Sequence, residues 1–272
     1  MSKILITGAA TGIGRDSAIT LAKLGHNVIA TAKRSGDFIE FQEYIREHNL
    51  QIEFVQLDVT KEEELQFIAE TEPDVLINNA AIGESGPLSE IPMERVKQSI
   101  ETNVYGVIRG SQLAAVSMLK KNVGRIIIVG STAGKVVIPF MGAYHMTKFA
   151  LEAAADGLRL ELEPRGIFVS LIEPGKIDTG FNQRMAATKH EWLDQSSAFS
   201  DKIERMKFVD KEFWTGGATT DSVVKAIVDA VEAKKPRARY VAPKINSVFI
   251  WLVKLLPDRL VDKGIRAFTK LK

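Results

Sequence analysis

The stretch "KILITGAATGIG", Lys3–Gly14, decides the fold. An apolar run begins at Ile4 and meets glycine at Gly8, which is typical of a buried strand that ends in a tight turn. Gly12 and Gly14 follow with the spacing G-x-x-x-G-x-G, just before a segment of helical periodicity. Glycines there let the backbone approach a pyrophosphate, and the helix N-terminus supplies unpaired N–H groups and a positive dipole end. A tight turn without a ligand is the alternative that the rest of the chain has to exclude.

Beyond this turn, short apolar runs alternate with helical patterns. We expect further strands in "NVIATA", "IEFVQLDV", "PDVLINNAA", "GRIIIVGS", "IFVSLIEPG" and "ARYVAP", and one long helical region from about residue 94 to 121. The runs are rich in Ile, Val and Leu and do not alternate with polar residues, which is typical of parallel strands covered on both faces. The sequence therefore predicts an α/β fold, a Rossmann-type doubly wound parallel sheet in a single dinucleotide-binding and catalytic domain over residues 1–243.

Two segments depart from this alternation. Residues 181–215 are polar with interspersed Met, Phe and Trp, and long insertions after the C-terminal ends of strands border ligand sites in such sheets. We expect a lid there, although a surface excursion with one or two helices is the alternative. Residues 244–272 form a second segment, a basic amphipathic helical tail in which Pro257 would start a second short helix.

The tail combines apolar faces with positive charge. Its apolar residues at helical spacing are Val248, Trp251, Leu252 and Leu255, and then Leu260, Val261, Ile265 and Phe268. From Lys234 to the end there are eleven Lys and Arg against two Asp, a net charge of +9, whereas the preceding residues carry −7. Such helices can lie in a membrane interface, so peripheral membrane contact is one expectation. Packing against the domain or against a partner subunit is the other.

The composition excludes several classes of protein. The chain has 272 residues and no cysteine, which rules out disulfides, thiolate metal sites and cysteine nucleophiles. Its four histidines are scattered without metal-ligand spacing, so we expect no metal, and a net charge of +2 gives no general attraction to nucleic acid. Apolar runs are too short for a membrane span or a signal-peptide core. We therefore expect a cytoplasmic protein without a transmembrane segment, peripheral at a membrane if the tail binds one.

The stretch "YHMTK", Tyr144–Lys148, places a phenol and an ammonium four residues apart. Apolar residues recur around it at helical spacing, so both side chains would lie on one helical face and could touch or face the same ligand. For these two residues alone, a half-buried tyrosine with a lysine extending past it is the alternative.

Together the motifs resemble the short-chain dehydrogenase/reductase family, short-subunit type, with its Y-x-x-x-K active site. The resemblance covers the chain to about Val241. Besides the glycine turn and "YHMTK", the matching motifs are "LDV" at Leu57–Val59, "NNAA" at Asn78–Ala81, "NVYG" at Asn103–Gly106, "GSTAG" around Ser131, and "PGKIDT" at Pro174–Thr179. Ala81 stands where glycine is usual and Ile177 where valine is usual, departures that leave the implied function intact.

The resemblance implies hydride transfer between a nicotinamide cofactor and a carbonyl carbon. Implied catalytic residues are Asn103, Ser131, Tyr144 and Lys148. Tyr144 would be the general acid in reduction and the base in oxidation, its pKa lowered by Lys148 and by the oxidised nicotinamide. Ser131 would hold the substrate oxygen, and Asn103 would anchor a water. Implied cofactor-binding residues are Gly8, Thr11, Gly12, Ile13, Gly14, Lys33, Arg34, Asp58, Val59, Asn79, Ala80, Ala81, Tyr144, Lys148, Pro174, Gly175, Ile177 and Thr179.

The end of the second strand favours NADP(H). Family members that use NAD carry Asp or Glu there to bind the ribose 2′-OH. Here Ala32 occupies that position, and Lys33 and Arg34 follow. A 2′-phosphate needs cationic donors and no carboxylate nearby. Two alternatives remain, namely that both cations are solvated loop charges and that Asp37 is a substitute ribose ligand.

The substrate is less constrained than the reaction. Apolar residues between Ser131 and Tyr144 and in the lid favour an apolar carbonyl or alcohol substrate, although many of them could be core. They are Val136, Val137, Ile138, Pro139, Phe140, Met141, Met185, Trp192, Phe199, Met206, Phe208 and Trp214. Family members are commonly homodimers or homotetramers. Two other functions are alternatives. One is a cofactor-sensing regulator, against which the general acid counts, because a sensor has no need of it. The other is a sugar-nucleotide epimerase or dehydratase, which generally has a larger C-terminal domain than this chain.

Overall fold

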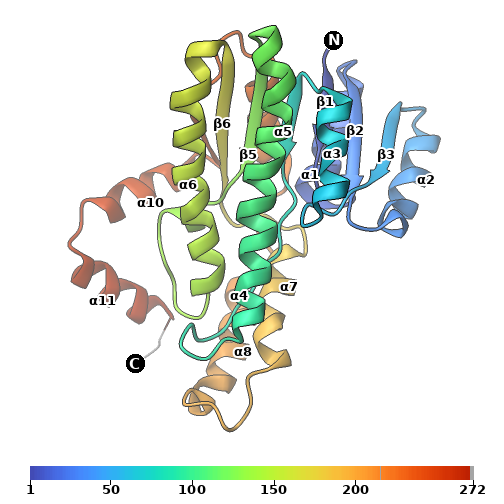
Figure 1. Ribbon diagram of the computed structural model, residues 1–272. Helices are drawn as coiled ribbons and strands as arrows, with labels where there is room; N and C mark the ends of the chain where they lie inside the picture. The colour runs from blue at the N-terminus through green and yellow to red at the C-terminus, as the bar shows by residue number, and fades with distance from the viewer. Residues whose placement is uncertain (215, 270–272) are drawn as a thin grey trace.

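The computed structural model describes residues 1–214 and 216–269, apart from the side chains of Phe208, Val209, Glu212, Phe213, Trp214, Phe249, Trp251, Lys254 and Phe268. Seven parallel strands form one sheet in this part of the chain, in the order β3-β2-β1-β4-β5-β6-β7 (Figure 1). The strands are β1 Lys3–Ile6, β2 Asn27–Ala32, β3 Ile52–Gln56, β4 Val75–Asn78, β5 Gly124–Val129, β6 Ile167–Pro174 and β7 Arg239–Ala242. The predicted doubly wound parallel sheet is confirmed, and its strand order reverses between β1 and β4.

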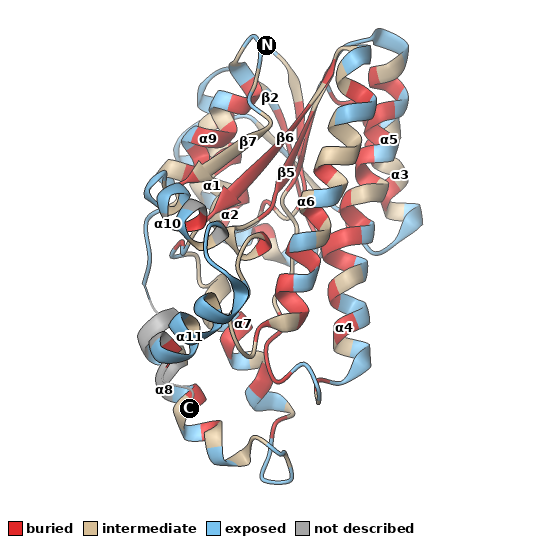
Figure 2. Ribbon diagram, turned by 90° about the vertical axis from the view of Figure 1, so that its left-hand side faces the viewer, coloured by how far each residue is buried: buried red, intermediate tan, exposed pale blue. Residues whose placement is uncertain are grey.

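Successive residues of the central strands enter two separate cores. Ile4 and Ile6 pack on one face of the sheet and Leu5 on the other, and all three are fully buried. Side chains in a strand alternate between faces, so a strand covered on both sides must be apolar at every position. This explains why the strands read as unbroken apolar runs (Figure 2).

Helices cover both faces of the sheet. On the first face lie α1 Gly12–Lys23, α2 Ile39–Glu47 and α9 Asp221–Glu232. On the second lie α3 Glu62–Thr71, α5 Gly106–Lys121 and α6 Gly142–Leu162. Short 3-10 turns at Ser35–Phe38, Thr132–Gly134 and Glu163–Arg165 join some of these elements.

The region expected as one long helix is interrupted. It consists of α4 Met93–Ile100, a π-helical segment Glu101–Tyr105, and α5. A π segment shifts the hydrogen-bond ladder by one residue while leaving the chain helical, and such segments are frequent at functional sites. The chain thus stays helical from α4 to α5, as expected, and only the hydrogen-bond pattern changes between them.

Beyond the carboxyl ends of the strands lie the two additional segments. Residues 181–215 contain α7 Phe181–Ala187, turns at Thr188–Glu191 and Ser200–Lys202, and α8 Ile203–Trp214. The tail contains α10 Ile245–Lys254 and α11 Asp258–Thr269, which begins directly after Pro257 as expected. In Figure 1 these segments lie to one side of the sheet and below it.

Phe41 offers a direct test of the first core. Its side chain is 1% exposed and contacts the ring of Phe54 edge-to-face with 5.1 Å between centroids. Phe41→Ala should lower the free energy of unfolding by about 3–5 kcal/mol, because a buried phenyl ring is lost and leaves a cavity. Ile39→Ala, on the same helix but 61% exposed, is the control and should change it by less than about 0.5 kcal/mol. Urea denaturation measures both, and equal losses would contradict this packing.

Candidate active site

A cavity of about 1040 Å³ opens at the carboxyl ends of the strands, where the strand order reverses. Ligands bind in this crevice in open α/β sheets. Most of the predicted site residues line it, namely Gly8, Thr11, Gly12, Ile13, Lys33, Asp58, Val59, Asn79, Ala80, Ala81, Ser131, Tyr144, Lys148, Pro174, Gly175, Ile177 and Thr179. Gly14, Arg34 and Asn103 are the predicted residues that do not contribute to its wall.

The glycine turn is held tightly at one end of the cavity. Gly8 has a φ of 64°, and a Cβ there would come within 2.7 Å of the Cα of Ala80. The side-chain amide of Asn79 donates to the carbonyls of Thr7 and Gly8 at 3.0 and 2.8 Å. Thr11 is the N-cap of α1, and its side chain makes no capping hydrogen bond. The first N–H groups of this helix have no intrahelical partner, so the turn fits a pyrophosphate.

Charged residues at the end of β2 are paired. Lys33 lies 3.0 Å from a carboxylate oxygen of Asp58, and Arg34 lies 3.0 Å from one of Asp37. The other carboxylate oxygen of Asp58 accepts hydrogen bonds from Thr60. Ala32, Lys33 and Asp37 line the cavity, so a cation and two carboxylates border this end of it.

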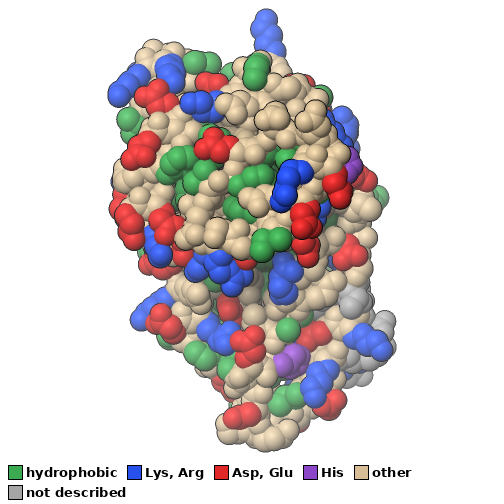
Figure 3. All heavy atoms as spheres, turned by 90° about the vertical axis from the view of Figure 1, so that its right-hand side faces the viewer, with side chains coloured by type: hydrophobic (Ala, Val, Ile, Leu, Met, Phe, Trp, Pro, Cys, Tyr) green, Lys and Arg blue, Asp and Glu red, His purple; other side chains and the backbone are tan. Residues whose placement is uncertain are grey.

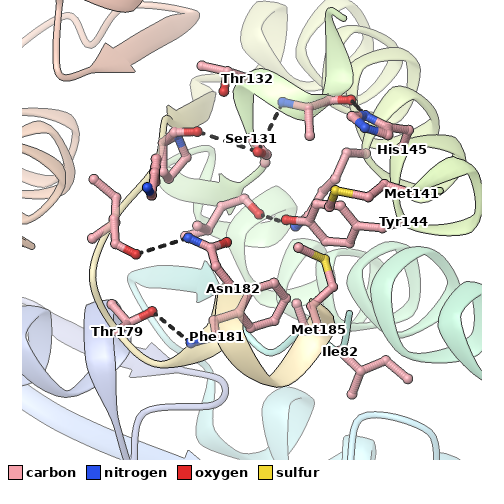
Figure 4. Close-up of a pocket in the computed structure, with 18 of the residues that line it drawn as sticks. Ile82, Ser131, Thr132, Met141, Tyr144, His145, Thr179, Phe181, Asn182 and Met185 are labelled. Atoms are coloured by element: carbon pink, nitrogen blue, oxygen red, sulfur yellow. Dashed lines mark hydrogen bonds between the residues drawn. The ribbon is translucent and has the colours of Figure 1, made fainter. Parts of the chain in front are cut away.

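At the other end, Tyr144 and Lys148 lie one turn apart on α6 and are both almost fully buried. The ammonium of Lys148 lies 5.6 Å from the centre of the Tyr144 ring and donates to the carbonyl of Val129, the last residue of β5, at 3.0 Å. Ser131 follows β5 and hydrogen-bonds the Tyr144 side chain. Figure 4 shows Ser131 and Tyr144 on the wall of one pocket, with Phe181 and Met185 beside the tyrosine. Three of the four implied catalytic residues therefore converge at the cavity.

Burial perturbs both ionisable groups of this pair. It raises the pKa of Tyr144 to about 12, against the opposing hydrogen bond from Ser131, and it lowers the pKa of Lys148 to about 8. The sequence led us to expect a lowered tyrosine pKa from Lys148 together with an oxidised nicotinamide. In the protein alone, desolvation outweighs the hydrogen bond from Ser131 and raises the pKa of the phenol instead. The phenol thus keeps its proton at neutral pH, as a general acid must.

Asn103 lies in the π-helical segment behind the cavity wall. Its Oδ1 accepts from the backbone N–H of Ile82 at 2.8 Å, and its Nδ2 donates to the Ile82 carbonyl and the Thr147 hydroxyl at 2.8 and 3.1 Å. Both amide protons are therefore used within the protein. The side chain joins the loop after β4 to α6, and the role of Asn103 as a water anchor stays a prediction.

His145 is a site residue that sequence reasoning missed. Its Nε2 lies 3.2 Å from the backbone N–H of Ile138, which can only donate, so Nε2 accepts and the proton resides on Nδ1. Nδ1 in turn donates to the Ala133 carbonyl at 2.7 Å. Burial lowers the pKa of His145, which favours this neutral form. The ring thereby fixes the loop that contributes Val136 and Ile138 to the cavity.

The expected substrate-contacting residues divide into two groups. Val136, Ile138, Met141 and Met185 line the cavity. Phe140, Trp192, Phe199 and Met206 instead pack around Leu193 and Ile203 in a separate hydrophobic cluster. Pro139 borders a small neighbouring cavity, Val137 is exposed, and the side chains of Phe208 and Trp214 lie outside the described residues.

The tail completes the cavity wall, so part of it packs against the domain, which is one of the arrangements expected from the sequence. Its lining residues are Asn246, Ile250, Val253, Leu256, Leu260, Val261, Gly264, Ile265 and Thr269. Asn246 packs so closely on Gly175 that a Cβ at that glycine would lie 1.9 Å from its amide nitrogen. The expected apolar face at Val248, Leu252 and Leu255 is exposed, whereas the Trp251 and Phe268 side chains lie outside the described residues.

Comparison with known proteins agrees with this geometry. A family model described as short chain dehydrogenase matches residues 2–190. The chain belongs to the short-chain dehydrogenase/reductase family. Among its relatives, an uncharacterized oxidoreductase, YbbO, of Escherichia coli is 33% identical, with 96% of this chain and 92% of the relative covered. A 3-ketodihydrosphingosine reductase of Bacteroides thetaiotaomicron is 31% identical over 99% and 98%, and an NADPH-dependent 3-dehydrocapnine reductase of Ornithobacterium rhinotracheale is 30% identical over 97% and 95%.

Solved structures of short-chain dehydrogenases share the fold. One from Burkholderia phymatum in complex with NAD has a TM-score of 0.79 at 22% identity, covering 93% of this chain and 92% of that one. Another, from Sphingobium yanoikuyae in complex with NADPH, has a TM-score of 0.72 at 21% identity, covering 94% and 97%. This chain is therefore an oxidoreductase of the family, with structural neighbours that bind either cofactor.

The buried phenol can be tested directly. Tyr144→Phe should lower turnover by about 10²–10⁴-fold, because the proton donor is removed while the ring still packs. Nicotinamide cofactor binding, followed by fluorescence, should remain close to that of the wild type. Tyr105→Phe, an exposed tyrosine, is the matched control and should keep full activity. A Tyr144→Phe enzyme with half of wild-type turnover would contradict the assignment.

His145 gives a prediction for pH. Its pKa is depressed by burial in the folded chain, while that of the unfolded chain lies near 6.5. The neutral ring therefore contributes stability above about pH 6.5, and this contribution is lost as the pH falls toward the folded-state pKa. His145→Gln cannot titrate, so its urea midpoint should fall less between pH 7.5 and 5.5 than that of the wild type. Equal losses would show that His145 does not titrate as described.

Proposed function

We propose that this chain is an NADP(H)-dependent oxidoreductase that interconverts a ketone or aldehyde and its alcohol on an apolar substrate. The observation that carries the proposal is the position of Tyr144, Lys148 and Ser131 in the same cavity as the glycine turn. A dinucleotide bound at that turn would extend toward a protonated phenol. A regulator that only senses the cofactor has no use for this buried acid.

The residues of the chain account for the proton in this reaction. A bound nicotinamide would supply the hydride to the carbonyl carbon in reduction and accept it in oxidation. In reduction, Ser131 would hold the carbonyl oxygen and the Tyr144 hydroxyl would give its proton to that oxygen. With a pKa of about 12 the phenol is a much stronger acid than an alcohol, whose acidity is near that of water at 15.7. Lys148 would then stabilise the phenolate that remains.

The preference for NADP(H) rests on residues at the end of β2. Ala32 lines the cavity where NAD-dependent members carry a carboxylate, and Lys33, whose ammonium is paired with Asp58, also lines it. Asp37, the alternative ribose ligand, is held by an ion pair with Arg34, which reduces its repulsion of a 2′-phosphate. One relative is named as an NADPH-dependent reductase. Structural neighbours bind NAD or NADPH and therefore do not distinguish the two cofactors. The proposed preference for NADP(H) rests on Ala32, Lys33 and Arg34.

A ketone with an extended apolar part is the substrate that the cavity fits best. Beyond Tyr144 the wall is formed by Met141 and Met185 and then by apolar residues of α10 and α11. The names of two relatives are those of a 3-keto and a 3-dehydro compound reductase, which supports reduction of a ketone. The test is NADPH oxidation with ketones and aldehydes of increasing chain length. Turnover should rise with chain length, and binding of NADPH without any turnover would favour the regulator.

We expect the chain to act as a homodimer or homotetramer, as family members commonly do. Exposed apolar residues on α5 and α6, namely Val116, Met146, Phe149 and Leu160, are available for such an interface. Analytical ultracentrifugation measures the state directly.

Cofactor choice is tested by Ala32→Asp. The new carboxylate should repel a 2′-phosphate and accept from a 2′-OH, so the ratio of kcat/KM for NADPH to that for NADH should fall by about tenfold or more. Ala32→Ser, which adds no charge, is the control and should leave the ratio nearly unchanged. A wild-type enzyme that already prefers NADH would overturn the proposed cofactor before any variant is made.

A further inference from the structure

The tail presents two different apolar faces. On its inner face, Ile250 and Val253 of α10 line the cavity, together with Val261 and Ile265 of α11. On the outer face lie Ile245, Val248 and Leu252 of α10 and its C-cap residue Leu255, all between 50% and 72% exposed and absent from the cavity wall. Their spacing of three and four residues places them in one stripe along the helix. We call these four residues the outer stripe.

The rim of the cavity lies between the two faces. Leu256 and Leu260, in and after the connection between α10 and α11, line the cavity and are also about half exposed. The same cavity continues past Met185 to Tyr144. Figure 2 shows α10 and α11 at the front of the molecule, coloured largely as exposed. A molecule that enters at these leucines therefore reaches the catalytic residues without leaving the cavity.

Positive charge is concentrated in the same segment. Residues 244–272 contain seven Lys and Arg against two Asp, a net charge of +5, whereas residues 1–243 carry 29 Lys and Arg against 32 Asp and Glu, or −3. Lys244, Arg259 and Lys263 are exposed. On the face of the molecule directed away from the tail, cationic and anionic side chains are interspersed (Figure 3). The charge asymmetry is thus specific to the tail.

An anionic lipid surface complements both properties of the tail. A second copy of the chain seated on the outer stripe would bring two tails of charge +5 together, which like-charge repulsion disfavours. Lipid headgroups would instead pair with the cations, while the boundary with the acyl chains accepts the leucines. Within the described residues no helix is both long and apolar enough to cross a bilayer. Contact must therefore be made along the surface, with the helix axes in the plane of the interface.

We propose that α10 and α11 dock on an anionic lipid surface through the outer stripe and its flanking cations. The rim at Leu256 and Leu260 then opens toward the lipid, so that an apolar ketone passes from the bilayer into the cavity. The docking proposal is argued from the exposed residues of the tail alone. Only the passage of substrate rests on the proposed function.

The experiment is sedimentation of the full-length protein with vesicles. Phosphatidylcholine vesicles are compared with vesicles that also contain phosphatidylglycerol, at low and at high salt. We expect the wild type to sediment with the anionic vesicles at low salt and to be largely released at high salt. Leu252→Asp should weaken partitioning by about tenfold or more, since an exposed apolar contact is replaced by a charge that the surface repels. Lys244→Gln and Lys263→Gln should each weaken it by about fivefold.

The matched control is Leu24→Asp, at the C-cap of α1, where the leucine is also about half exposed. It should bind vesicles as the wild type does. Thermal unfolding verifies that each variant is folded, and ultracentrifugation reports its oligomeric state. The proposal is overturned if the wild type stays in the supernatant with anionic vesicles at low salt. It is also overturned if the tail variants bind like the wild type, or if Leu252→Asp dissociates an oligomer without changing vesicle binding.

Activity and docking are measured separately, so that each proposal can fail alone. An enzyme that reduces ketones but never binds vesicles would remove the docking proposal and leave the proposed function. A protein that binds anionic vesicles but reduces no ketone or aldehyde would remove the proposed function and leave the docking proposal. With both intact, Leu252→Asp should reduce a short soluble ketone at the wild-type rate and lose activity only toward a ketone presented in anionic vesicles.

Discussion

The site depends on one buried hydrogen bond, from the ammonium of Lys148 to the carbonyl of Val129. It ties α6 to the carboxyl end of β5, where a parallel strand leaves carbonyl groups without a partner in the next strand. Tyr144, one turn earlier on the same helix, is thereby placed beside Ser131, which follows the same strand. Burial of this pair also determines its acid–base behaviour. It raises the pKa of the Tyr144 phenol, which therefore stays protonated, and it lowers the pKa of the Lys148 ammonium. The packing of α6 against β5 thus both positions the two side chains and shifts their pKa values.

The two halves of the cavity are built in different ways. The cofactor half is formed by adjacent elements, in which the backbone of the glycine turn packs directly on Ala80 and is held by Asn79. The proposed substrate half brings together segments that are far apart in sequence, namely the loop fixed by His145, α7, and the two tail helices. The first half is suited to a ligand common to a whole family. The second half can change with the substrate without disturbing the sheet.

The sequence was sufficient for the sheet and for most of the site because both depend on local patterns. Unbroken apolar runs identify strands buried on both faces, and the motifs around Ser131 and Tyr144 predict the proposed catalytic residues. What it could not predict depends on tertiary structure. The π-helical segment around Asn103 is a change in backbone hydrogen bonding that the sequence pattern did not reveal, and the ring of His145 has a role only because the loop around Ile138 folds back over it. The rings of Trp192 and Phe199 were equally compatible with a pocket and with the core that they form.

The central claim is that this chain transfers a hydride to a carbonyl carbon and a proton from Tyr144 to its oxygen. It is tested most directly with NADPH that carries deuterium at both C4 positions, incubated with long-chain ketones and analysed by mass spectrometry. The account predicts one deuterium on the carbinol carbon of the product, with the hydroxyl proton derived from solvent. Binding of the labelled cofactor without deuterium in any alcohol, across a panel of ketones and aldehydes, would contradict it and identify the chain as a cofactor-binding protein without catalysis.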